Sequence, residues 1–249
     1  MPEGDSLRAI AASMQPLVGE VVSVEAVHPR ARLLRVAERL DGHELVSVDA
    51  YGKNLILRFK PDLVLVSHLM MRGRWSVRPL SDDSPGRGKP WLRITSSTHE
   101  ATQWNGPVLE LGDRRVRRAG PDIMERPARI EAVLTSLRAA RQDRAIGDVL
   151  LDQHVVAGIG NLWRSEILFL AKLPPQQLLG EISDPHLRAV IELASDSMSE
   201  GRNTPSVYRR ARRPCRVCGS LIASRRLGDH GRNVYWCPSC QAGNARPST

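Results

Sequence analysis

Cysteine is missing from the first 214 residues of this 249-residue chain, and no apolar run approaches the roughly 18 residues that a membrane helix needs. The first ten residues, MPEGDSLRAI, contain two acids and no hydrophobic signal region. These absences argue against a disulfide-stapled secreted protein and against a membrane-spanning one. We expect a cytoplasmic protein without a membrane partner.

The composition is that of a globular protein with an excess of positive charge. Apolar residues make up 41% and charged residues 25%, and the length suits one or two domains with a packed core. The net charge of +9 favours a polyanionic partner such as nucleic acid. Lysine is scarce, with 4 residues against 32 arginines, so the arginine codon bias of a GC-rich genome explains the excess equally well.

The four cysteines form two C-x2-C pairs separated by 18 residues: Cys215, Cys218, Cys237 and Cys240. Paired knuckles at this spacing are typical of one tetrahedral four-thiolate zinc site. Four protein ligands leave no open position, so such a zinc ion is structural. The alternatives are a reduced metal-free thiol cluster and two disulfides.

Residue periodicity divides the chain into a β-rich part and a helical part. Residues 5–18 follow helical spacing, with Asp5 or Ser6 as the predicted cap. Short β-rich runs then predict a β-sandwich or barrel. They cover residues 21–27, 33–40, 45–52, 54–59, 63–69, 91–95 and 108–111, with a polar loop at 78–90.

A linker at 120–130 leads into four segments with 3.6-residue periodicity, at 130–140, 145–153, 161–173 and 186–201. From Thr204 onward the chain is rich in arginine around the cysteine pairs. Arginines on a metal-pinned hairpin suit contact with DNA phosphates, and the alternative is a solvated basic face.

Four segments in chain order carry a resemblance to a known family. They are MPEG at the N-terminus, YGKNLILRF at 51–59, LDQHVVAGIGNLWRSEILF at 151–169 and GRNVYWCPSCQ at 231–241. With them the chain resembles the bacterial DNA glycosylase/AP lyases of the formamidopyrimidine-DNA glycosylase and endonuclease VIII family. The resemblance implies an enzyme that excises oxidised bases from damaged DNA and nicks the strand by β,δ-elimination.

The resemblance also implies a multi-domain α+β fold around a DNA cleft. An N-terminal two-layer β-sandwich would occupy residues 1–118 and a linker residues 119–130. A helix–two-turn–helix domain would follow at 131–210, and a zinc finger at 211–243. We expect a monomer.

Pro2 and Glu3 are the expected catalytic residues at the N-terminus. Removal of Met1 would expose Pro2 as a secondary amine, and an α-amino group has a pKa of about 8, below that of lysine. Such an amine can attack the sugar C1′ and form an iminium, with Glu3 as general acid/base. Without the family context, this dipeptide is an ordinary solvated terminus.

Two further segments match family positions in the catalytic part. The resemblance places Lys53 near the lesion and its phosphate, although a lysine at a turn is often only solvated. Met70, Met71 and Arg72 match the loop that fills the hole left by a flipped-out base, a role that suits flexible methionine. The alternative is that both methionines belong to the core.

Three residues are expected to hold DNA. Asn161 follows two glycines at a helix start, where free N–H groups suit a phosphate, although it could serve as an N-cap only. Arg118 matches a DNA-contacting arginine of the endonuclease VIII branch. Arg232 matches the finger arginine that grips phosphates and assists the second elimination, and a guanidinium suits that role. The alternative for Arg232 is a solvated arginine.

Two positions depart from the family pattern. Ser6 stands where many members have Glu, and the segment Asp113–Val116 lacks the Phe of the formamidopyrimidine branch. The start MPEG and the finger sequence SRRLGDHGRNVYWCPSC favour the endonuclease VIII branch and oxidised pyrimidines. The competing function is a zinc-finger DNA-binding protein without catalysis, which would have no need to keep Pro2, Glu3 and Lys53 together.

Overall fold

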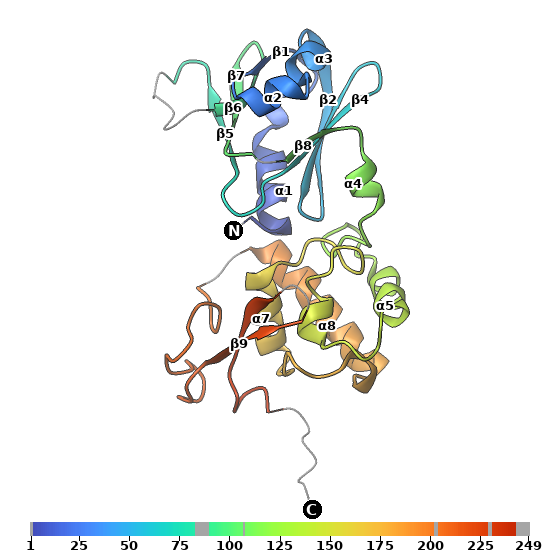
Figure 1. The fold of residues 1–249 in the computed structure, drawn as a ribbon, viewed down its shortest axis with the longest axis vertical. Coiled ribbons are helices and arrows are strands. Elements are labelled where there is room, and N and C mark those ends of the chain that lie inside the picture. The colour runs from blue at the N-terminus through green and yellow to red at the C-terminus, as the bar shows by residue number, and fades with distance from the viewer. Residues whose placement is uncertain (1, 83–89, 107, 202–203, 229–230, 243–249) are drawn as a thin grey trace, which may run out of the picture. The chain divides into compact units, whose positions relative to one another are not determined.

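The computed structural model describes residues 2–82, 90–106, 108–201, 204–228 and 231–242, and it divides the chain into two compact units, Met1–Arg118 and Ala119–Thr249. Figure 1 shows strands in the first unit and mostly helices in the second. Among the described residues, no helix combines the length and the apolar character needed to cross a bilayer.

The first unit is built on eight antiparallel strands in the order β5-β7-β6-β1-β2-β3-β4-β8. Their bounds are β1 (Val21–Ala26), β2 (His43–Tyr51), β3 (Asn54–Phe59), β4 (Leu63–His68), β5 (Arg74–Pro79), β6 (Pro90–Thr95), β7 (His99–Trp104) and β8 (Val108–Leu111). Only two residue pairs join β1 to β2, so the sheet consists of two four-stranded halves. Apolar side chains from both halves and from α1 (Gly4–Ser13) share one buried core, which confirms the predicted sandwich.

The first helix begins earlier than its sequence pattern predicts. Glu3, rather than Asp5 or Ser6, is the N-cap of α1, and the helix gives way after Ser13 to the 3-10 turn η1 (Gln15–Leu17). The amphipathic pattern holds, because Leu7, Ala11 and Leu17 are buried. The sequence pattern placed the cap two or three residues too late. Glu3 caps the helix through reciprocal hydrogen bonds with Ser6, which lies inside the first turn.

Residues 33–40 form two short helical segments joined by a turn, contrary to the β-strand prediction. They form the end of α2 (Pro29–Leu33) and all of α3 (Val36–Leu40). The leucine at 33 is 81% exposed, whereas Val36 and Leu40, four residues apart, are fully buried. Burial at this spacing suits one face of a helix rather than one face of a strand.

Strands β5 and β7 were not predicted, because their sequences RWSVRP and HEATQW are largely polar. Long-range pairing of the two strands and buried hydrogen bonds accommodate these polar side chains. The predicted polar loop at 78–90 overlaps the end of β5 and the start of β6, and its residues 83–89 lie outside the described part of the chain.

The second unit contains the helical region and the cysteine-bearing hairpin. Its longer helices are α5 (Ile130–Ala139), α7 (Asn161–Leu170) and α8 (Asp184–Glu200), which share a second buried core. The shorter elements are α4 (Arg114–Arg117) at the end of the first unit, then α6 (Ile146–Val149), η2 (Leu179–Glu181), β9 (Ala223–Leu227) and β10 (Arg232–Trp236). The predicted helix at 145–153 is therefore a single turn followed by irregular chain.

Candidate active site and nucleic-acid interface

The N-terminus of α1 holds the two expected catalytic residues. Pro2 is half-buried, and the side chain of Glu3 is completely buried. The backbone N–H of Glu3 donates to Ser6 Oγ at 3.5 Å, and the Glu3 side chain accepts from the Ser6 backbone N–H, which together form a capping box. Ser6, the departure from the family pattern, therefore helps to hold Glu3 in place.

Two turns of the first unit lie at the same end of the sheet. Asn54 begins β3 and pairs with His68, the last residue of β4, so the β2–β3 turn adjoins the turn that follows β4. Gly52 adopts a φ of 57° in the first of these turns, and Lys53 follows it. Burial, and then the charges of Arg115 and Lys53, lower the pKa of His68 to about 4. The structure thus brings Lys53 and Arg115 close to His68.

The turn from Leu69 to Gly73 carries the predicted wedge residues. His68 Nδ1 accepts the N–H of Met70 at 3.1 Å, and Met70 is held at a φ of 50°. The Gly73 N–H donates to the Leu69 carbonyl at 2.8 Å, and a Cβ at Gly73 would lie 2.5 Å from that oxygen. Only glycine fits there.

Met70 and Met71 project from this turn. Their side chains are 47% and 53% exposed, and Arg72 is exposed as well. The two methionines are therefore not core residues. Exposed apolar side chains on a tightly closed turn suit insertion into a base stack.

We expect acid to destabilise the protein through His68. Its folded-state pKa of about 4 lies below the ordinary 6.5, so between these values the unfolded chain binds a proton that the folded chain does not. The stability that neutral His68 contributes is complete above pH 6.5 and falls by up to about 3 kcal/mol as the pH drops to 4. Thermal unfolding of the wild type and His68→Gln at about pH 7 and pH 4.5 measures this loss. An equal acid-induced drop in both proteins would contradict a neutral His68.

Four arginines gather at the end of the first unit. Arg114 and Arg115 of α4 each lie 3.8 Å from a carboxylate oxygen of Glu110, and Arg117 pairs with Asp113 at 2.7 Å. Arg118, the predicted DNA contact, follows directly as the exposed C-cap. The segment that lacks the Phe of the formamidopyrimidine branch is therefore a helical turn with a basic surface.

In the second unit, a glycine turn leads into α7. Gly158 has a φ of 106°, and Gly160 rather than Asn161 is the N-cap. The Gln153 amide holds the turn, because it donates to the Ile159 carbonyl at 3.0 Å and accepts the Gly158 N–H at 3.1 Å. Backbone N–H groups at the start of a ten-residue helix suit a phosphate.

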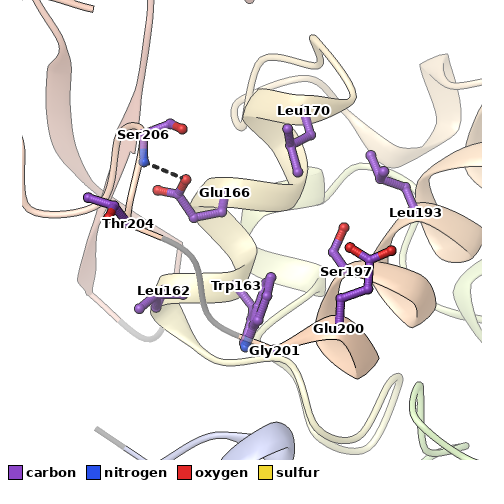
Figure 2. A pocket seen from close by; sticks show the side chains of 10 residues that line it. All are labelled: Leu162, Trp163, Glu166, Leu170, Leu193, Ser197, Glu200, Gly201, Thr204 and Ser206. Atoms are coloured by element: carbon purple, nitrogen blue, oxygen red, sulfur yellow. Dashed lines mark hydrogen bonds between the residues drawn. The ribbon is translucent and has the colours of Figure 1, made fainter. Parts of the chain in front are cut away.

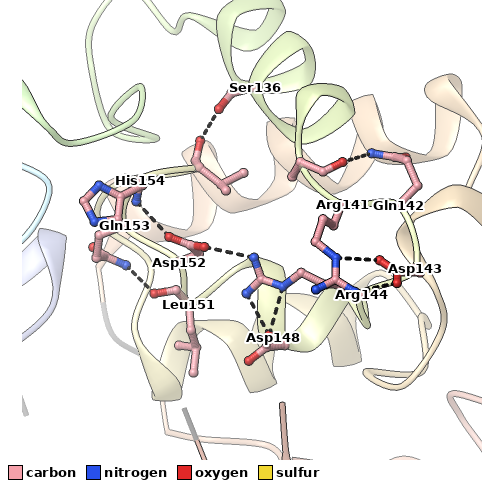
Figure 3. A network of polar contacts seen from close by, with 12 residues as sticks. Ser136, Arg141, Gln142, Asp143, Arg144, Asp148, Leu151, Asp152, Gln153 and His154 are labelled. Atoms are coloured by element: carbon pink, nitrogen blue, oxygen red, sulfur yellow. Dashed lines mark hydrogen bonds and ion pairs between the residues drawn. The ribbon is translucent and has the colours of Figure 1, made fainter. Parts of the chain in front are cut away.

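A network of charged side chains supports the chain just before this turn (Figure 3). Arg144 pairs with Asp148 at 2.7 Å and with Asp152 at 2.9 Å. Burial opposes ionisation of Asp152, but hydrogen bonds from Arg144 and from the His154 N–H lower its pKa overall. This ion-pair network ties Arg144 to the single turn of α6 and to the irregular chain that follows it.

The side chain of Asn161 reaches the cysteine-bearing hairpin instead of capping its own helix. It donates to the Asn233 carbonyl at 3.0 Å and accepts a hydrogen bond from Arg164. Arg164 is fully buried and also donates to the Asn233 carbonyl at 3.1 Å and the Arg232 carbonyl at 3.5 Å. The structure thus brings Asn161 together with Arg232, whose side chain is exposed.

A second buried charge ties α7 to the chain that precedes the cysteines. The Glu166 carboxylate accepts the N–H groups of Ser206, Val207 and Tyr208 at 2.8 to 3.0 Å. Glu166 also lines a pocket of about 380 Å³ between α7 and α8, with the side chains of Trp163 and Leu170 (Figure 2). None of the described residues that line this pocket is a predicted site residue.

The four cysteines form one cluster whose sulfur atoms all lie within 4.8 Å of one another. Cys218 and Cys237 lie 3.4 Å apart and Cys215 and Cys240 lie 3.9 Å apart, and all four cysteines are free rather than disulfide-bonded. Four sulfurs bound tetrahedrally at about 2.3 Å lie about 3.8 Å apart. The cluster therefore has the geometry and the donor set of a metal site.

Sequence reasoning missed His68 and Arg164, which hydrogen-bond the predicted residues Met70 and Asn161. It also missed two residues that fix the chain around α7, Gln153 and Glu166. Gln153, Arg164 and Glu166 lie inside a segment that carried the family resemblance. Arg164 and Glu166 bind partners far along the chain, whereas Gln153 binds Gly158 and Ile159 in the same segment. His68 alone had a local signal, a histidine two residues before the first of the two methionines.

Comparisons with known proteins cover nearly the whole chain. A family model described as the formamidopyrimidine-DNA glycosylase N-terminal domain matches residues 1–118, and one described as the H2TH domain of the same glycosylase matches residues 119–206. The chain is 33% identical to a probable endonuclease 8 2 of Streptomyces coelicolor, over 98% of this chain and 95% of that protein. It is also 33% identical to the DNA-(apurinic or apyrimidinic site) lyase Nei2 of Mycolicibacterium smegmatis, over 97% and 99%.

Solved structures with the same fold include Lactococcus lactis formamidopyrimidine DNA glycosylase bound to DNA that contains an AP site. The TM-score is 0.81, with 22% sequence identity over 96% of this chain and 99% of that one. At 22% sequence identity, the structural similarity establishes that the two proteins share a fold.

Proposed function

Because this chain belongs to the formamidopyrimidine-DNA glycosylase family, we propose that it is a DNA glycosylase and AP lyase that excises oxidised bases, mainly pyrimidines. The observation that carries the proposal is the fully buried carboxylate of Glu3 at the start of α1, directly after Pro2. A carboxylate buried beside the terminal amine is held by hydrogen bonds at the start of α1, a position that suits proton transfer at the sugar.

In the proposed reaction, the amine of Pro2 attacks C1′ of the damaged nucleotide and displaces the base. Glu3 acts as the general acid/base for the proton transfer at the sugar that accompanies this step. The resulting iminium acidifies the 2′-proton, and its loss expels the 3′-phosphate. A second elimination expels the 5′-phosphate, with Arg232 stabilising the departing charge. Lys53 is proposed to hold a phosphate near the lesion, close to His68 and Arg115.

DNA binding is proposed to use both units. Met70, Met71 and Arg72 would fill the space of the flipped-out base, an assignment that their exposure supports. Arg118, Asn161 and Arg232 would contact phosphates. The proposal includes a monomer that acts on chromosomal DNA in the bacterial cytoplasm. The organisms of the two relatives named above are bacteria.

The cysteine cluster is proposed to hold one structural zinc ion. Zinc suits four thiolates without redox chemistry, and the sulfur separations match its tetrahedral geometry. The ion would pin the β9–β10 hairpin, whose second strand begins at Arg232, and thereby fix the backbone that Asn161 and Arg164 contact.

Removal of the metal is expected to lower DNA affinity about tenfold or more, because it releases the hairpin that carries Arg232. Cys237→Ser should lose both stoichiometric zinc and affinity. Ser239→Ala, which removes a hydroxyl 2.7 Å from Ser220 Oγ in the same knuckles, is the matched control and should keep both. Metal analysis with a DNA-binding titration measures the effect, and full affinity in a zinc-free protein would contradict it.

A lesion panel tests the function itself. Duplexes that each carry one oxidised pyrimidine, one formamidopyrimidine, one abasic site or no lesion are incubated with the protein, and released base and strand cleavage are measured. Excision of the pyrimidine lesions with cleavage at the abasic site would support the proposal. Tight DNA binding without reaction on any duplex would instead identify a DNA-binding protein without catalysis.

A further inference from the structure

A buried polar cluster lies directly beneath the turn that carries Met70 and Met71. Its members are Ser67 on β4, Trp75 on β5 and Gln103 on β7, and we call them the turn clamp. Trp75 Nε1 donates to Ser67 Oγ at 3.1 Å, and Gln103 Nε2 donates to the same oxygen at 2.6 Å. Ser67 and Gln103 are completely buried, and Trp75 is 7% exposed.

The turn clamp joins the two halves of the sandwich at the base of the turn. Ser67 lies two residues before Leu69, and Trp75 two residues after Gly73, so both stems of the turn are held. Ser67 belongs to the half that contains β2, β3 and β8, whereas Trp75 and Gln103 are paired partners in the other half. The hydrogen bonds therefore fix the separation between β4 and β5, the two strands that the turn connects.

Burial of the Gln103 amide lowers the stability of the fold relative to an apolar side chain that packs equally well. Its Oε1 is buried and has no hydrogen-bond partner within the described residues. The backbone at Gly106 covers the amide, since a Cβ there would lie 2.1 Å from Gln103 Cδ. An apolar side chain of similar volume would avoid that cost, so the amide is best explained by a positioning role.

We propose that Gln103, through Ser67 and Trp75, positions the Met70–Met71 turn for insertion into duplex DNA. The inference rests on the proposed glycosylase function. Gln103 is a positioning residue, because it acts through the turn and does not touch the reacting atoms. Its effect should appear only where a base must be extruded and its space filled.

Gln103→Met tests this inference, because methionine keeps the volume and removes the amide. Two rates are compared, base excision from a duplex with one oxidised pyrimidine and strand cleavage at an abasic site in the same sequence. We expect about a tenfold loss of excision and abasic cleavage within about twofold of wild type, with a melting temperature no lower than wild type. A fluorescent 2-aminopurine beside the lesion should report slower base extrusion.

A second variant and a matched control accompany this comparison. Trp75→Phe removes the indole N–H from the same oxygen and should shift the ratio of the two rates in the same direction, even if Gln103→Met does not fold. Thr102→Val is the control, since it deletes a buried hydrogen bond to Glu100 on the same strand, outside the turn clamp. Thr102→Val should leave the ratio of base excision to abasic cleavage at its wild-type value.

The decisive measurement repeats Gln103→Met in a Met70→Ala, Met71→Ala background. If the amide acts through the turn, it causes no further loss of excision there. The same loss in both backgrounds, or an unchanged ratio in Gln103→Met and Trp75→Phe, would overturn the inference alone. Absence of excision by the wild-type protein on every lesion would overturn the proposed function and this inference with it.

Discussion

Residues added ahead of Pro2 are expected to abolish covalent trapping of the protein on abasic DNA by borohydride. The extension converts the secondary amine into an amide, which has no lone pair available to attack C1′. Trapping should fall by about a thousandfold or more, to the background of the assay, because no other step can form the reducible iminium. DNA affinity should stay within about twofold, since the extension changes no proposed phosphate contact.

The experiment compares three proteins on the same abasic duplex. The mature wild type, whose intact mass should show that Met1 has been removed, should trap with the adduct mapped to Pro2. Pro2→Gly keeps a terminal amine and should retain partial trapping. If the extended protein traps at the wild-type rate, the nucleophile lies elsewhere and the proposed mechanism is wrong.

Glu3→Gln is expected to lower base excision by about a hundredfold or more, which is the usual contribution of a positioned general acid or base. Cleavage at an existing abasic site should be affected much less, because no glycosidic bond remains to be broken. Glutamine keeps the shape of the side chain and an acceptor for the Ser6 N–H, so α1 should still be capped. The effect therefore separates proton transfer from helix stability.

Asp5→Asn provides the matched control, since Asp5 is an acid in the first turn of the same helix and only half-buried. It should leave both rates near wild type. Single-turnover excision and abasic cleavage are measured for each protein, together with thermal unfolding. Equal losses of both rates in Glu3→Gln would indicate that Glu3 supports the fold rather than the chemistry.

Features that depend on short-range spacing were predictable from the sequence. The two C-x2-C pairs predicted a metal cluster because each knuckle brings its own two sulfurs together, and the structure places all four within 4.8 Å. Helical periodicity predicted α5, α7 and α8, since residues three and four apart share a face whatever the rest of the chain does. The same local rule failed at residues 33–40, where short apolar runs suit strand and helix equally well.

Features that depend on distant partners were decided by the tertiary structure. Strands β5 and β7 have few apolar residues, and each is held by pairing with a distant strand. Whether Met70 and Met71 were core or exposed was settled by the tight turn that His68 and Gly73 close.

Asn161 looked like a candidate N-cap in the sequence, yet its amide binds Asn233, 72 residues away. Ser6 was the converse case, a departure from the family whose role became clear only when Glu3 was found to be its hydrogen-bond partner. Local spacing determines which residues can share a turn or a metal ion. Which side chains contact each other across the fold depends on how the strands and helices pack. That packing follows from all residues acting together, so it cannot be derived from local patterns in one sequence.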